Sequence, residues 1–207
     1  MPAEIASWSK YLPNVIQAKY EIHDYKHASA ILYSEFRDLL NELCTALEAF
    51  SLTREDIITP GGNESTIPKK FSDILRPMGW VERKLNAKVI VDDNEISHDT
   101  HYVDYIKGRV AFDLEWNSKD QTFDRDLYAF RAFFEYDKIS VGVLVTRSKD
   151  LDEYFRELGT YVAEDGSQKA YMAKYGASTT HMGKLIPRLE SGRNGGCQYL
   201  LLVLLEK

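Results

Sequence analysis

The sequence has few cysteines and no long apolar run, and each absence excludes a class of protein. Two cysteines, Cys44 and Cys197, lie far apart among 207 residues, without the spacing of a zinc site or a disulfide framework. The longest apolar run, Tyr199 to Leu205, is far shorter than the roughly 20 residues that cross a bilayer, and the N-terminus has no signal-peptide pattern. We therefore expect a cytoplasmic protein with reduced thiols and no membrane partner.

Glycine and proline are also sparse, and positive charge is not in excess. With 12 Gly, 6 Pro and 28% charged residues, the composition is that of a globular protein and not of a disordered or fibrous one. We expect a single domain over residues 1–207. The net charge of −6 argues at first against a nucleic-acid partner. However, an enzyme can gather carboxylates around metal ions and confine its basic residues to one cleft, so net charge alone does not decide.

Hydrophobic spacing predicts the secondary structure. Apolar residues three and four positions apart predict one helix over 28–50 and a second over 69–78, closed by Gly79, with Trp80 in the core. Further elements are expected as strands at 88–91, 109–116, 139–146 and 198–205, and as helices at 124–136 and 149–159. The last strand is apolar throughout, which is typical of a strand covered on both faces. We predict an α/β or α+β fold with a central mixed sheet flanked by helices.

Carboxylates mark the strand at 109–116. Because side chains alternate along a strand, Asp113, Glu115 and Asn117 are expected on one face. Two carboxylates on a half-buried face repel each other unless a cation such as Mg²⁺ lies between them. Asp104 adds a third at hairpin-like distance, and such a set could serve phosphodiester hydrolysis. The alternative is chance, because 32 acidic residues produce this spacing often.

The same segment carries a resemblance to a known family. Asp104 to Trp116, the helix after it and the strand after Asp137 resemble the catalytic region of the BglII- and BstYI-like type II restriction endonucleases, within the PD-(D/E)xK nuclease superfamily. The stretch from Gly183 to Arg193 is similar more loosely.

The resemblance implies roles for the three carboxylates. Asp104 would be the first metal ligand and Asp113 the second. Glu115 stands where the superfamily most often has Lys and where the BamHI-like enzymes have Glu. It would therefore act as a ligand of a second metal or as the general base on the attacking water.

Polar residues beside this strand and before the last one are candidates for DNA contact. They are Asn117, Ser118, Lys119, Thr180, His181, Lys184, Arg193 and Asn194. Asn can bind adenine through two hydrogen bonds, and Lys and Arg can reach guanine or phosphate. For each residue the alternative is a structural turn or a solvated charge, and for Lys119 we favour the solvated turn. Glu64 could donate a further carboxylate, but we favour a helix start capped by Asn63.

The family implies a function with partners. It implies a Mg²⁺-dependent homodimer that cuts double-stranded DNA at a short palindrome, a hexamer with a GATC core, and leaves 5′ overhangs. A cognate DNA methyltransferase would protect the host sites. Two alternatives stay open at this point. One is a PD-(D/E)xK nuclease of repair or of modification-dependent restriction, and the other is a non-catalytic DNA-binding protein with the same fold.

Overall fold

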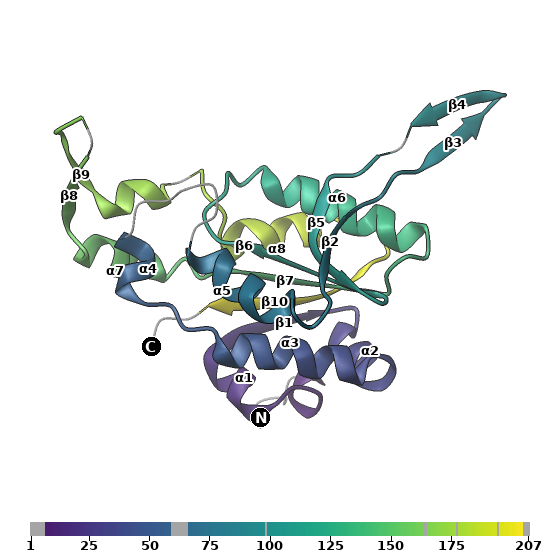
Figure 1. Cartoon of the computed structure of the whole chain (residues 1–207), viewed down its shortest axis with the longest axis horizontal. Helices are drawn as coiled ribbons and strands as arrows, with labels where there is room; N and C mark the ends of the chain where they lie inside the picture. Colours follow the sequence, from purple (N-terminus) through teal and green to yellow (C-terminus); the bar gives the residue numbers. More distant parts are fainter. Residues whose placement is uncertain are drawn as a thin grey trace.

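A six-stranded mixed sheet lies at the centre of the computed structural model, which describes residues 7–58, 66–97, 99–163, 165–176, 178–193 and 195–204 (Figure 1). The strand order is β1-β10-β7-β6-β5-β2. The bounds are β1 (Tyr20–Tyr25), β2 (Val81–Lys84), β5 (Tyr102–Lys107), β6 (Val110–Glu115), β7 (Val141–Arg147) and β10 (Gln198–Leu204). Strands β6, β7 and β10 run parallel, and β1, β5 and β2 join them in antiparallel pairs.

Helices cover both faces of this sheet (Figure 1). One face carries α1 (Asn14–Lys19), α2 (Ala28–Glu35), α3 (Arg37–Ala49) and α5 (Thr66–Leu75), and the other carries α6 (Thr122–Glu135) and α8 (Met182–Glu190). Each face has its own apolar core: Leu43 and Phe71 pack against Phe112 on one side, and Phe130 and Leu185 belong to the other. The predicted flanked mixed sheet is therefore confirmed.

The remaining elements are short and lie around this body. They are η1 (Ser7–Lys10), α4 (Arg54–Ile58), α7 (Leu151–Glu157), η2 (Tyr171–Tyr175), and the hairpins β3 (Lys88–Val91) with β4 (Asn94–Ser97) and β8 (Thr160–Val162) with β9 (Gln168–Ala170). The two hairpins project at opposite ends of the long axis (Figure 1). No helix in the described part of the chain is long and apolar enough to cross a membrane.

The inner strands are built mostly from apolar side chains, with Asp113 and Glu115 as the charged exceptions in β6 and Arg147 in β7. Every residue of β6 and β7 is buried, and so is β10 after its first residue. A parallel strand between two helical layers requires this pattern. The predicted last strand, covered on both sides, is confirmed, and Trp80 is fully buried as expected.

Two helix predictions need correction. The single helix expected over 28–50 is two helices, α2 and α3, because Phe36 adopts φ −132° and ψ 42° between them. The Phe36 side chain packs against the core, and this tertiary contact outweighs the local preference for an unbroken helix. The helix expected over 69–78 and closed by Gly79 is α5, which begins and ends three residues earlier, so that Gly79, with a left-handed φ of +90°, lies four residues beyond its end.

The predicted strand at 88–91 forms outside the central sheet. It is β3, and it pairs only with β4 in a hairpin whose Ile90 side chain is 73% exposed. No helix was predicted at α8, which lies in a stretch of the sequence rich in Gly, Ser, Thr, Lys and Arg. Both cysteines are free and buried.

Candidate active site

Strand β6 carries two buried carboxylates. Asp113 is 3% exposed and Glu115 is 7% exposed. Phe112 and Leu114, which directly precede them in the strand, belong to the core on the opposite side of the sheet. The predicted alternation along this strand is therefore confirmed for these residues. Asn117 lies beyond the end of β6 and is exposed, so its expected place on the same strand face is wrong.

Asp104 reaches this site from the neighbouring strand. Strands β5 and β6 pair antiparallel, with Tyr105 opposite Phe112. The backbone N–H of Asp104 donates a hydrogen bond of 2.6 Å to Oδ1 of Asp113. The hairpin-like distance expected from the sequence is thus realised by direct strand pairing, which brings the first two carboxylates together.

A fourth carboxylate, Asp126, comes from helix α6. It is 2% exposed and interacts with Glu115 through a carboxyl–carboxyl hydrogen bond. Sequence reasoning missed it, although a signal existed: Asp126 lies three residues after Phe123 and four before Phe130, on the helix face that the buried phenylalanines define. An acidic residue on an apolar helix face indicates a special environment.

Burial raises the pKa values of all four carboxyl groups, and nearby negative charges add to each shift, with Glu82 supplying the charge that acts on Asp104. For Asp113 the largest cause is burial, followed by the negative charges of Asp104 and Asp126, and its pKa lies well above the usual range. Burial raises the pKa of Asp126 to about 9, and the charge of Glu115 adds to the shift. Burial also raises the pKa values of Asp104 and Glu115. Opposing these causes, the Arg125 guanidinium lowers the pKa of Asp104, Glu115 and Asp126.

The donor atoms of this cluster suit a hard divalent cation. Oε2 of Glu115 and Oδ2 of Asp126 are buried, and neither accepts a hydrogen bond from the described part of the chain. Within the described ranges, no three His, Cys, Asp or Glu side chains are arranged to enclose a metal ion. Mg²⁺ does not need such an enclosure, because one or two carboxylates, water and a substrate phosphate commonly complete its shell.

Two polar segments meet beside the carboxylates. One is Asn117–Asp120, directly after β6, and the other is Ser178–His181, directly before α8. The N–H of Asp120 donates to the carbonyl of Ser178 at 2.8 Å, and the N–H of Thr180 donates to the carbonyl of Ser118 at 2.9 Å. An isolated β-bridge joins Lys119 to Thr179. The structure therefore brings together candidates for DNA contact that lie about 60 residues apart in the sequence.

The side chains of these candidates differ in exposure. Asn117, Ser118 and Lys119 are exposed, whereas Thr180 is fully buried and its hydroxyl has no partner. His181 is half-buried, and burial together with the charge of Arg147 lowers the pKa of its imidazole.

The two remaining described candidates are basic and already paired. Lys184 Nζ lies 3.0 Å from Oδ2 of Asp120, and Arg193 pairs with Asp124 at the far end of α8. Asn194 lies outside the described residues, as do Asn63 and Glu64.

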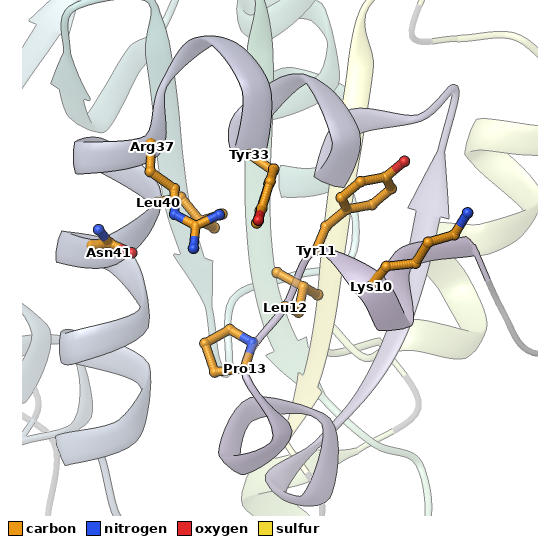
Figure 2. Close-up of a pocket in the computed structure, with 8 residues that line it drawn as sticks. All are labelled: Lys10, Tyr11, Leu12, Pro13, Tyr33, Arg37, Leu40 and Asn41. Atoms are coloured by element: carbon orange, nitrogen blue, oxygen red, sulfur yellow. The ribbon is translucent and has the colours of Figure 1, made fainter.

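A cavity of about 200 Å³ lies elsewhere, next to α2 and α3 (Figure 2). Its lining consists of Lys10, Tyr11, Leu12, Pro13, Tyr33, Arg37, Leu40 and Asn41. The Arg37 guanidinium lies 3.8 Å from the centre of the Tyr33 ring. No candidate site residue lines this cavity, which is separate from the carboxylates.

Comparison with protein families gives a match over most of the chain. No curated protein matches the chain. The profile of the family described as restriction endonuclease BglII/BglIII matches residues 20–204, from the first residue of β1 to the last of β10. The match includes the whole central sheet, the four carboxylates and both polar segments, and it confirms the resemblance to BglII-like enzymes. The chain therefore belongs to the BglII/BglIII family of restriction endonucleases.

Proposed function

We propose that this chain is a Mg²⁺-dependent type II restriction endonuclease that hydrolyses phosphodiester bonds at a short palindromic site in double-stranded DNA. The observation that carries the proposal is the group of four carboxylates, in which Asp113, Glu115 and Asp126 are buried and Asp104 is half-buried, in a chain of this family. Buried carboxylates without matching cations destabilise a fold, so their presence together favours a function that uses their charge.

Each carboxylate has a role in the proposed site. Asp104 and Asp113 hold the cation, and the hydrogen bond from the Asp104 N–H fixes Oδ1 of Asp113, which orients the carboxyl group. When bound, Mg²⁺ polarises the phosphate and stabilises the charge that develops on the leaving oxygen. Glu115 accepts a hydrogen bond from the Ser118 hydroxyl. It has two chemically sound roles, as a ligand of a second cation in the BamHI-like manner or as the base that accepts the proton of the attacking water.

The two polar segments form the proposed DNA-contacting surface. Exposed Asn117, Ser118 and Lys119 lie directly after the carboxylate strand, and His181 lies beside them. In this proposal Lys184 and Arg193 release their carboxylate partners and bind DNA phosphates instead. Thr180 belongs to the second segment, and Asn194, next to Arg193 in the sequence, is a further candidate. For Lys119 we favoured a solvated turn from the sequence. In this proposal its exposed ammonium is a further candidate for binding a DNA phosphate.

The proposal includes the assembly and its biological setting. A two-fold symmetric homodimer of this single 207-residue domain places one carboxylate site on each strand of a palindrome. By family likeness, the target is a hexamer with a GATC core. A cognate DNA methyltransferase would protect host sites, and the enzyme would meet incoming DNA in the cytoplasm.

The test is a digest of unmethylated phage DNA and of adenine-methylated phage DNA, in Mg²⁺ and in Ca²⁺, read on a gel. We expect discrete bands from unmethylated DNA in Mg²⁺ alone, and sequencing of their ends gives the recognition site. The Asp113→Asn variant should give none, and Asp73→Asn, on the exposed surface of α5, should cut normally. Cutting of methylated DNA alone would identify a modification-dependent nuclease. A mobility shift without cutting would identify a DNA-binding protein.

A further inference from the structure

Arg147, the last residue of β7, is a buried cation that the proposed chemistry does not use. Only 1% of its side chain is exposed. Nη1 lies 2.9 Å from Oδ1 of Asp152, and Nη2 donates to the hydroxyl of Thr179 at 2.9 Å. The guanidinium also lies 5.5 Å from the ring centre of Phe155 and 5.7 Å from that of Tyr175. These contacts hold it in one orientation.

The position of Arg147 relates it to the carboxylate strand. Strand β7 runs parallel to β6, with Thr146 opposite Glu115. The hydroxyl of Thr146 donates to the carbonyl of Glu115 at 2.7 Å. Arg147 therefore lies on the strand next to β6, one residue beyond the position opposite Glu115. This is the end of the sheet at which the two polar segments meet.

Its contacts lead from the sheet to both polar segments. The Thr179 hydroxyl accepts from Arg147 and donates to the carbonyl of Gly176 at 2.8 Å. The backbone of Thr179 forms the bridge to Lys119, and the next residue binds the carbonyl of Ser118. One guanidinium is thus linked to Ser178–His181 directly, and to Asn117–Asp120 through a single further residue.

A guanidinium in this place is costly for the fold alone. Its Nε is buried without a hydrogen-bond partner, and an apolar residue of similar volume often stabilises a protein as well as a buried ion pair does. The planar fork, however, holds two groups at fixed directions at once, which an ammonium or a thioether does not. The geometry favours a role in fixing the segments relative to each other.

We propose that Arg147 is a positioning residue for DNA recognition: by holding the Thr179 hydroxyl, it keeps Ser178–His181 against Asn117–Asp120, so that the two segments meet the DNA as one surface. This inference rests on the proposed function. It assigns Arg147 and Thr179 to the binding of DNA and not to the chemical step. Their loss should therefore raise KM and leave kcat nearly unchanged.

The sharpest test is Thr179→Val, which removes the hydroxyl and keeps the shape. The matched control is Thr100→Val, because the buried Thr100 hydroxyl also accepts and donates one hydrogen bond, but near the β3–β4 hairpin. The substrate is a short duplex that carries the site at which the wild-type protein cuts unmethylated phage DNA. We expect Thr179→Val to raise KM about tenfold, the effect of a lost hydrogen bond to a charged group, with kcat within about threefold. Thr100→Val should leave KM unchanged.

Arg147→Lys and Arg147→Met extend the test. Lys keeps the charge but cannot hold Asp152 and Thr179 in the same fork, so KM should rise, and it should rise further in Arg147→Met. If Arg147→Met does not fold, Thr179→Val and Arg147→Lys carry the comparison. Binding of the duplex in Ca²⁺, without cleavage, should weaken in the same order.

The outcomes separate the two proposals. Absence of cutting by the wild-type protein contradicts the proposed function. Wild-type cutting with an unchanged KM in Thr179→Val, or a fall in kcat at constant KM in either Arg147 variant, contradicts the role assigned to Arg147 and leaves the nuclease assignment standing.

Discussion

Two buried polar regions lie on neighbouring strands and differ in how their charges are balanced. At the end of β7, Arg147 has an anion, a hydroxyl and two aromatic rings around it. In the second region, Asp113 and Glu115 of β6 are joined by Asp104 of β5 and Asp126 of α6, and among the described residues the ion pair that reaches them joins Arg125 Nε to Asp126 Oδ1 at 3.7 Å. In the first region the charge of Arg147 is paired with an anion of the same chain. The second has an excess of negative charge, which favours a cation supplied from outside.

The largest effect is expected when a carboxylate that would bind the cation is removed from the second region. Asp104→Ala and Asp113→Ala should each lower cleavage of unmethylated phage DNA at least about a thousandfold, because a lost metal ligand removes several kcal/mol of transition-state stabilisation. The circular dichroism spectrum should stay that of the wild-type protein. Near-normal cleavage by either variant would show that the site is elsewhere.

A smaller loss of activity is expected for Glu115→Lys. Lysine cannot ligate a cation and, when protonated, cannot accept a proton, so both roles of Glu115 are lost, and the rate should fall about a hundredfold or more. The matched variant is Glu115→Gln, which keeps the size of the side chain. Cleavage by Glu115→Lys at the wild-type rate would mean that Glu115 does not touch the cation or the water.

The next prediction concerns the stability of the first region. Asp152→Ala leaves the buried Arg147 charge without its anion, at a cost of about 3 kcal/mol in the free energy of unfolding. Asp165→Ala is the control, because its ion pair with Lys169 is exposed. Chemical denaturation measures both. Equal stability of the two variants would show that Arg147 does not depend on Asp152.

The smallest effect is expected from replacing Asp126, one carboxyl group of the second region. Because burial raises the pKa of Asp126 to about 9, the folded protein keeps a proton there that the unfolded chain releases near pH 4. Wild-type stability should therefore fall as pH rises from about 5 to 9, whereas Asp126→Asn lacks this loss. In EDTA at pH 8 we expect the variant to be more stable by about 1 kcal/mol or more. A stability difference that does not change with pH would contradict the raised pKa.

The comparison also shows what the sequence could and could not predict. The alternation that puts Asp113 and Glu115 on one face is local to one strand, so it could be predicted from spacing. The contribution of Asp126 depends on how α6 packs on β6, which spacing within either element does not determine. The same limit applies to the two polar segments, because their contact is made by pairs such as Lys119 and Thr179, distant in sequence.

The same distinction between local patterns and contacts distant in sequence applies to the fold. Strands built mostly from apolar residues, β6, β7 and β10, were predicted within two residues at each end. The break at Phe36 and the separation of β3 from the sheet depend on tertiary contacts, and neither has a local signal such as Pro or Gly.

The central claim is that the carboxylates of β5 and β6 form a cation-dependent nuclease site. The most direct measurement is a time course of unmethylated phage DNA with the wild-type protein and with Asp113→Asn, in Mg²⁺ and after addition of EDTA. The account predicts discrete fragments only for the wild-type protein in Mg²⁺, and no further cutting once EDTA is added. Equal fragmentation by Asp113→Asn, or cutting that continues in EDTA, would contradict it.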